Sequence, residues 1–266
     1  MGETKMNVKL LAHTQLSKWF LNENIESYLR NSELRWATDG QIVALTAIRT
    51  CYSPNKPTEI LIIEGERYFG RDATDGGGGT EADRLFRQIV ASKHTSTLEH
   101  LAFVFAVEGV SRACLAQLTR HRIGFSYSVQ SQRHVKFGSG DRTGGFDYVV
   151  PPSIENCEKE FWRGGTAKQI FERVMKTIQD AYDDLRELGV PAEDARMILP
   201  QASATNITLT INLRALLDFY TKRRKGSGAQ WEIAELAERL RKEVVAVEPW
   251  LDPFFEKDHS LERGGV

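Results

Sequence analysis

Two short strand-like segments set among helical ones are the feature that most constrains the fold of this 266-residue chain. LAFVFAVEGV (101–110) is rich in Val and Phe. TNITLTI (205–211) alternates polar and apolar residues, as a strand with one buried face does. The chain has no internal repeat and no clean linker, so we predict one α+β domain over residues 1–266, with helices packed around a twisted, mostly antiparallel sheet.

Helical spacing of apolar residues covers most of the remaining sequence. We predict helices over 17–30, 40–51, 81–92, 112–122, 158–188, 191–199, 212–223 and 228–247. Residues 53–79 contain Pro54, Pro57 and four consecutive glycines, Gly76 to Gly79, so we interpret this stretch as an irregular surface insertion. Residues 123–137 also read as irregular.

Composition limits the kind of protein. The formal net charge of -1 argues against a protein that coats nucleic acid. The three cysteines, Cys51, Cys114 and Cys157, form no CxxC pair, which favours a reducing compartment and supports neither a disulfide framework nor a metal site. No apolar run reaches the ~20 residues of a membrane span. We therefore expect a soluble, cytoplasmic protein without membrane, metal or nucleic-acid partners.

Polar side chains are densest between His94 and Arg133. Arg120, His121 and Arg122 are consecutive, and serines follow them toward Arg133. On a continuous helix, Gln117, Arg120 and His121 would share one face. Guanidinium groups beside hydroxyls suit a phosphate, because arginine offers planar, bidentate donors. A solvated basic turn has the same composition, so these residues alone leave both interpretations open.

The run RHRIGFSYSVQSQR (120–133) resembles the signature of the flavin-dependent thymidylate synthases, at the longer of that family's two spacings. Four further segments match the family in order: AIRTCYS (47–53), KHTSTLEH (93–100), ARMILP (195–200) and NLRALLDFYTKRR with AQWEI (212–233). The resemblance spans most of the chain. Lys93 and His134 depart from it, since they stand where the family usually has Gly and Tyr.

This resemblance implies a site for dUMP and a site for FAD. The residues implied for dUMP are Gln117, Arg120, Ser131, Gln132, Arg133, Arg196 and Arg223. Those implied for FAD are Cys51, His94, Ser96, Glu99, His121, Arg122, Ile123, Asn212, Arg214 and Asp218. Arg214 and Asp218 are four residues apart, so a simple ion pair between them is the alternative interpretation.

Two residues are implied at the catalytic centre. Arg223 matches the arginine that polarises uracil, although Arg224 could be the true equivalent. Ser131 lies in the signature but has no adjacent base to make it a nucleophile.

The implied reaction converts dUMP to dTMP, with 5,10-methylenetetrahydrofolate as carbon donor, NADPH as reductant and tetrahydrofolate as a product. Reduced flavin takes over the role of a cysteine nucleophile. The family also implies a homotetramer whose active sites are shared between subunits. The rival interpretations are a non-catalytic nucleotide- or RNA-binding protein and a different flavoenzyme.

Overall fold

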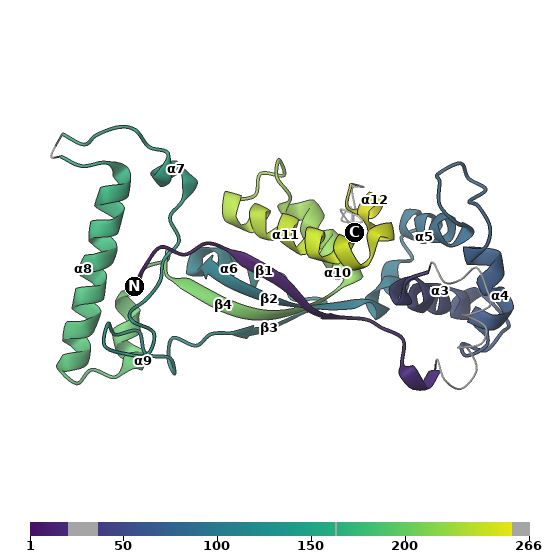
Figure 1. Ribbon diagram of the computed structural model, residues 1–266, viewed down its shortest axis with the longest axis horizontal. Coiled ribbons are helices and arrows are strands. Elements are labelled where there is room, and N and C mark those ends of the chain that lie inside the picture. The colour runs from purple at the N-terminus through teal and green to yellow at the C-terminus, as the bar shows by residue number, and fades with distance from the viewer. Residues whose placement is uncertain (21–36, 163, 257–266) are drawn as a thin grey trace, which may run out of the picture.

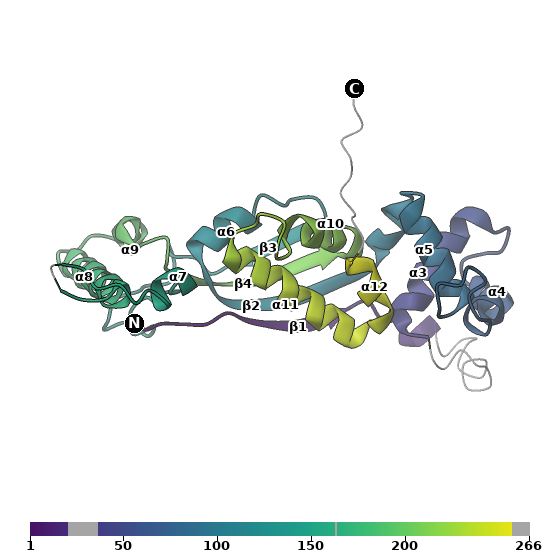
Figure 2. The same cartoon turned by 90° about the horizontal axis from the view of Figure 1, so that it is seen from above.

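A computed structural model describes residues 1–20, 37–162 and 164–256. The molecule is elongated, with a sheet at its centre and helices at both ends (Figure 1). Figure 2 shows the same order from above: α8 lies at one end, and α3, α4 and α5 lie at the other. None of the described helices is both long and apolar enough to cross a bilayer.

In the described residues one sheet is formed by β1 (Asn7–His13), β2 (Ala102–Ser111), β3 (Phe125–Val129) and β4 (Ala204–Asn212). Their order is β1-β2-β4-β3, and every neighbouring pair is antiparallel. Alternate residues of β2 and β4 are buried, because successive side chains of a strand point to opposite faces. The α+β prediction and both predicted strands are confirmed.

Helices α10 (Leu213–Arg223) and α11 (Trp231–Val247) lie over one face of this sheet (Figure 1). Between the helices and the strands lies the main apolar core, which includes Phe103, Phe105, Leu209, Ile211, Leu216, Phe219, Leu236 and Leu240. Both helices are confirmed from the sequence. Because α10 begins directly after β4, the core sets where the first residues of that helix stand.

The end of the molecule next to η2 is helical. It contains α3 (Asp39–Tyr52), α4 (Ile60–Phe69), α5 (Glu81–Ala91) and the 3-10 helix η2 (Thr95–His100). Thr38 and Thr80 begin α3 and α5 with capping boxes, each accepting a hydrogen bond from the backbone three residues on. The helices predicted over 40–51 and 81–92 are confirmed. Most of the helix predicted over 17–30 lies outside the described residues.

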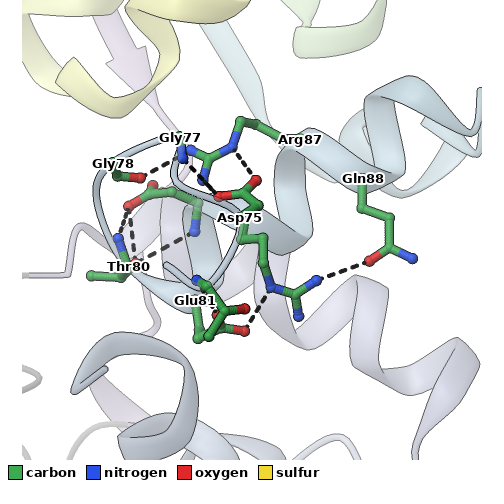
Figure 3. Close-up of polar contacts among 10 residues, drawn as sticks. Asp75, Gly77, Gly78, Thr80, Glu81, Arg87 and Gln88 are labelled. Atoms are coloured by element: carbon green, nitrogen blue, oxygen red, sulfur yellow. Dashed lines mark hydrogen bonds and ion pairs between the residues drawn. The ribbon is translucent and has the colours of Figure 1, made fainter. Parts of the chain in front are cut away.

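The prediction that 53–79 is irregular is wrong for residues 60–69, which form α4. Ile60 and Leu61 of that helix are fully buried. Residues Gly76 to Gly79 do form an exposed loop, and side chains of α5 hold it in place (Figure 3). Arg87 pairs with Asp75 through two hydrogen bonds, of 3.0 and 2.6 Å, and also donates to the carbonyl oxygen of Gly78 at 3.1 Å.

The opposite end has its own small core, which includes Phe137, Phe146, Tyr148, Met175 and Tyr182. Around it lie α7 (Pro152–Glu155), α8 (Ala167–Glu187), α9 (Ala192–Ala195) and the 3-10 helix η3 (Arg196–Ile198). The helix predicted from 158 begins only at Ala167, where Thr166 forms its capping box. After α11 the chain continues into η4 (Pro249–Leu251) and α12 (Asp252–Phe255).

Two further predictions near the signature are wrong. Helix α6 (Arg112–Leu118) is capped by Ser111 as predicted, but it ends at Leu118 and not at residue 122. Arg120 and His121 therefore do not lie on a helical face with Gln117. The stretch predicted as irregular over 123–137 contains β3, which pairs with β4 from Phe125↔Ile211 to Val129↔Ile207.

Candidate active site

The signature loop after α6 is held by contacts to its own strand and to the start of α10. The Tyr127 hydroxyl donates to the carbonyl oxygens of Leu118 and His121, at 2.9 and 2.6 Å. Gly124 has a φ of 74°. A Cβ there would lie only 2.6 Å from the Cβ of Ala215, so the backbone can approach α10 only because the residue is glycine. The Asn212 amide completes the contact by donating to the Gly124 carbonyl at 3.1 Å.

His121 lies between this loop and α10. Its ring packs edge-on against Phe219 at 4.9 Å between centroids, and Arg223 Nε donates to His121 Nε2 at 3.0 Å. Burial and, second to it, the positive charge of Arg223 lower the pKa of His121 to about 4. The ring is therefore neutral near pH 7, and because its Nε2 accepts, its proton is on Nδ1.

The structure thus brings together His121, predicted for the flavin, and Arg223, predicted for the uracil. Arg224, the alternative to Arg223, follows the last residue of α10 as its C-cap. Its amide donates to the Tyr220 carbonyl at 2.7 Å.

Residues predicted for the flavin continue along the start of α10. The Asn212 side chain caps α10 by accepting from the Ala215 amide at 2.9 Å. Arg214 forms an ion pair with Glu99 of η2, whereas Asp218 pairs with Lys222 at 2.7 Å. The alternative that Arg214 and Asp218 pair with each other is therefore wrong. The other carboxylate oxygen of Asp218 is buried and has no hydrogen-bond partner in the described structure.

A hollow of about 560 Å³ lies beside η2, where that helix meets α3. Cys51 and Ser96, both predicted for the flavin, line it together with apolar residues of the chain's first segment and of α3. Next to it, the Tyr52 hydroxyl is 2.6 Å from His94 Nδ1. Its lining residues are Leu16, Phe20, Val43, Thr46, Ala47, Thr50, Cys51, Pro57, Thr58, Ser96, Thr97 and His100.

A second group forms where β3 ends. Ser131 Oγ accepts from the Arg133 amide at 3.2 Å, which shapes the turn after the strand. Arg133 Nε donates to the Glu193 carboxylate at 2.7 Å, and Arg196 Nε donates to the Glu193 carbonyl at 2.9 Å. Arg133 and Arg196, both predicted for the nucleotide, therefore meet at one residue, with Gln132 buried beside them.

Arg112 belongs to this second group, although the sequence analysis did not select it. Burial lowers the pKa of its guanidinium, and the nearby positive charge of Arg196 lowers it further. The described part of the chain shows no carboxylate in an ion pair with Arg112. Two neighbouring guanidinium groups without an acid between them suit an anionic ligand. The sequence offered one weak signal, since Arg112 directly follows the helix cap Ser111.

The two groups lie at opposite ends of β3. His121 precedes the strand and Arg133 follows it. Four residue steps of about 3.3 Å put the ends of β3 roughly 13 Å apart. Gln117 lies on α6 between the groups, and its amide donates to the Ala113 carbonyl at 3.4 Å. One subunit therefore separates Arg223 and Arg120 from the other residues predicted for dUMP. Arg122 and Ile123 are exposed in the signature loop, Ile123 to 91%.

Comparison with solved structures supports this architecture. A UMP/dUMP methylase, PolB, from Streptomyces cacaoi, solved with 5-Br dUMP, superimposes with a TM-score of 0.66 at 20% identity, covering 96% of each chain. Thymidylate synthase X from Helicobacter pylori, solved with FAD and dUMP, gives a TM-score of 0.58 at 22% identity. It covers 96% of this chain and 100% of that one. At these identities the likeness establishes the fold.

Sequence comparison establishes the family. The family model described as thymidylate synthase complementing protein matches residues 33–250. The flavin-dependent thymidylate synthase of Geobacter sulfurreducens is 46% identical over 216 residues, which cover 81% of this chain and 82% of the relative. That of Clostridium tetani is 32% identical over 232 residues, with the same shares covered. The chain therefore belongs to the flavin-dependent thymidylate synthase family, and it is an enzyme of that family.

Proposed function

We propose that this enzyme converts dUMP to dTMP with 5,10-methylenetetrahydrofolate as carbon donor, NADPH as reductant and FAD as cofactor, releasing tetrahydrofolate. The observation that carries the proposal is the 3.0 Å hydrogen bond from Arg223 to His121. It joins the signature loop, predicted for the flavin, to the arginine predicted to act on the pyrimidine. Related proteins solved with 5-Br dUMP and with FAD and dUMP support the same ligands.

The residues around η2 and the start of α10 fit FAD. The hollow beside η2 offers apolar walls for part of the cofactor, with the Ser96 hydroxyl on the same wall. Arg214, near the N-terminus of α10, can hold a phosphate, since helix N-termini favour anions. Asp218 supports this fit, because its buried, unpartnered oxygen can accept a hydrogen bond from a ligand. When bound and reduced, FAD supplies the hydride equivalent for the methylation.

The second group fits the nucleotide phosphate. A phosphate dianion needs several donors, and Arg112, Arg133 and Arg196 converge from three different elements. At the other end of β3, Arg223 can stabilise negative charge that develops on a uracil carbonyl oxygen. Because His121 is neutral, it neither repels nor neutralises the Arg223 guanidinium, whose positive charge stays available to the substrate.

The cysteines support a mechanism without an enzyme nucleophile. Cys114 is buried, and burial together with the nearby charge of Glu232 raises the pKa of its thiol, which stays protonated. Cys51 is exposed on the wall of the hollow, whose lining includes neither Arg223 nor a residue of the signature loop. Ser131 Oγ accepts hydrogen bonds from the Arg133 and His134 amides, so its role is to stabilise the turn after β3. Three free cysteines also favour a reducing compartment, and we place the enzyme in the cytoplasm.

We further propose that the active site is completed between subunits of a homotetramer. Its support is the position of the two groups at opposite ends of β3, which places Arg133 and Arg223 of one subunit apart along that strand. The second group of one subunit would then face the flavin group of another. Nucleic acid is not needed as a partner, in keeping with the net charge of -1.

The test is an assay under low oxygen with purified protein, dUMP, methylenetetrahydrofolate, NADPH and FAD, in which dTMP is quantified by mass spectrometry. We expect dTMP only when all components are present, and no covalent dUMP adduct on any cysteine. Ser131→Ala should retain measurable turnover. Failure to form dTMP in protein that binds flavin and dUMP would overturn the proposed reaction.

A further inference from the structure

Glu232, outside both groups, is a buried carboxylate whose hydrogen bonds lead to the nucleotide side of the site. It lies in the first turn of α11 and is 2% exposed. One of its oxygens accepts from the Ser111 amide at 2.7 Å, and the other accepts from the Ser111 hydroxyl at 2.5 Å. Within the described residues its side chain accepts from these two donors, and no cation forms an ion pair with it. A buried charge held in this way is costly unless its hydrogen bonds are kept.

Ser111 is the residue at which β2 becomes α6. It is the last residue of β2, and its hydroxyl caps α6 by accepting from the Cys114 amide at 3.0 Å. The two intervening amides, of Arg112 and Ala113, donate to backbone carbonyls of Ser203 and Gln201 at 2.9 and 3.1 Å. Every amide from Ser111 to Cys114 therefore has a partner. A single side chain, that of Glu232, anchors the first of these residues from outside the sheet.

The beginning of α6 carries residues of the site. Arg112 is the first residue of α6 and lies close to Arg196, and Gln117 follows on the next turns. Their positions depend on where the first turn of α6 is held, because a short helix moves as a rigid unit. The anchor matters more here than in a long helix, since α6 has only 7 residues.

We propose that Glu232 is a positioning residue for dUMP: it holds Ser111, and through Ser111 it sets the place of Arg112 and Gln117. This inference rests on the proposed function, because it assigns these residues to the nucleotide. Geometry and not charge carries the effect. A glutamine can accept from the Ser111 amide through its oxygen and donate to the Ser111 hydroxyl through its nitrogen. Alanine can do neither, and it leaves the Ser111 amide buried without a partner.

The test measures the Kd for dUMP and the Kd for FAD separately on the purified full chain. We expect Glu232→Ala to raise the Kd for dUMP by about tenfold, the size that a lost cap or buried hydrogen bond gives. We expect the Kd for FAD to stay within about twofold, because Asn212, Arg214 and Glu99 do not depend on Ser111. Glu232→Gln should restore dUMP binding to within about twofold of the unchanged protein.

Two further variants make the outcome decisive. Ser111→Ala should raise the Kd for dUMP as Glu232→Ala does, and the double variant should raise it no further, since both remove one anchor. Glu235→Ala is the matched control, because it removes a carboxylate one turn along that pairs with Arg239 at 2.6 Å. It should leave both constants unchanged.

Unchanged dUMP binding in both Glu232→Ala and Ser111→Ala overturns the inference. A parallel loss of dUMP and FAD binding in these variants also overturns it, since that is what general unfolding produces. If Glu232→Ala does not fold, Ser111→Ala and Glu232→Gln still decide the matter. Absence of dUMP binding in the unchanged protein would instead overturn the proposed function.

Discussion

The Arg133 guanidinium donates to the Glu193 carboxylate at 2.7 Å, so an acid of the same subunit occupies one face of a side chain that we assign to the nucleotide phosphate. Both partners are largely exposed, at 60% and 45%. An exposed ion pair of this kind stabilises a protein by roughly 0–1 kcal/mol. The Glu193 carboxylate therefore holds Arg133 only weakly, and a phosphate can displace it at a small cost in free energy.

We expect Glu193→Gln to tighten dUMP binding by up to about fivefold, because the phosphate no longer has to displace a charged competitor. Calorimetric titration with dUMP at low and high salt measures the effect, which should shrink as salt screens the pair. Asp180→Asn is the control, since it removes an exposed carboxylate that is paired with Lys176 and not with an arginine of this group. Weaker dUMP binding in Glu193→Gln would mean that the carboxylate orients Arg133 for the phosphate.

Gly124 allows the close approach of the signature loop to α10. We expect Gly124→Ala to destabilise the enzyme by about 3 kcal/mol, from the left-handed backbone and from overlap with Ala215. Gly226→Ala isolates the first effect, because Gly226 has a φ of 89° but open space around it. It should cost only about 1 kcal/mol. Chemical denaturation gives both values, and equal costs would show that the loop can move away from α10.

His121 makes the stability of the ligand-free enzyme depend on pH. Its pKa is about 4 in the folded enzyme, against an ordinary value of 6.5 that we take for the unfolded chain. The unfolded chain therefore binds more protons at His121 between these values, and stability falls as the pH drops from about 6.5 toward 4. The denaturant midpoint of His121→Gln, measured from pH 7 to 4.5, should change less with pH than that of the unchanged enzyme. A parallel slope in both proteins would refute the assignment.

The ion pair between Arg87 and Asp75, more than packing, should protect the glycine-rich loop from proteolysis. Replacing Arg87 by Ala removes the contacts to Asp75 and Gly78, so we expect faster proteolytic cleavage between Gly76 and Gly79 with little change in global stability. Lys176→Ala, which breaks an exposed pair on α8, is the control. Hydrogen bonds from Arg87 lower the pKa of Asp75 to about 2. Protection should therefore persist at pH 4 and disappear only as the pH falls from about 3.8 toward 2.

The sequence predicted the elements whose local pattern agrees with their burial. The strands at 101–110 and 205–211 and the helices over α5, α10 and α11 are of this kind. β3 was missed although Phe125, Tyr127 and Val129 alternate with serines as in a strand, because the segment is only five residues long and lies in a polar stretch. β1 was not predicted, because it is an edge strand in which Val8 is the single buried residue and its apolar pattern is weak.

Other errors concern helix boundaries, where a correct signal in the sequence was given less weight than a competing one. Pro54 and Pro57 made the region before α4 look irregular, although Ile60 to Ile63 begin an amphipathic helix. The start of α8 at Thr166 carries a capping box, Thr166 with Gln169, which marks the boundary better than the charge pattern upstream. The early end of α6 has no Gly or Pro to mark it in the sequence, and in the structure the Tyr127 hydroxyl donates to the Leu118 carbonyl at that end.

The residues of the candidate site also fall into those that the sequence analysis selected and those that only the structure revealed. The signature motif pointed to His121 and Arg133, which lie close together in RHRIGFSYSVQSQR, whereas the family resemblance of a separate segment pointed to Arg223. The sequence analysis missed Arg112 and Tyr52, whose neighbours in the structure, Arg196 and His94, are distant in sequence. It also grouped Arg120 with Arg133, although β3 separates them. Only the tertiary structure can show which members of a motif face the same ligand.

The length of β3 has a consequence for mixtures of damaged enzymes. If each catalytic centre draws its phosphate-binding arginine from one subunit and its flavin-binding loop from another, then two inactive variants can rescue each other. Subunits carrying Arg133→Ala, unfolded and refolded together with subunits carrying Asn212→Ala, should regain part of the activity that neither has alone. Mixing two stocks of the same variant should restore nothing. A cell carrying both damaged genes would then grow without added thymidine.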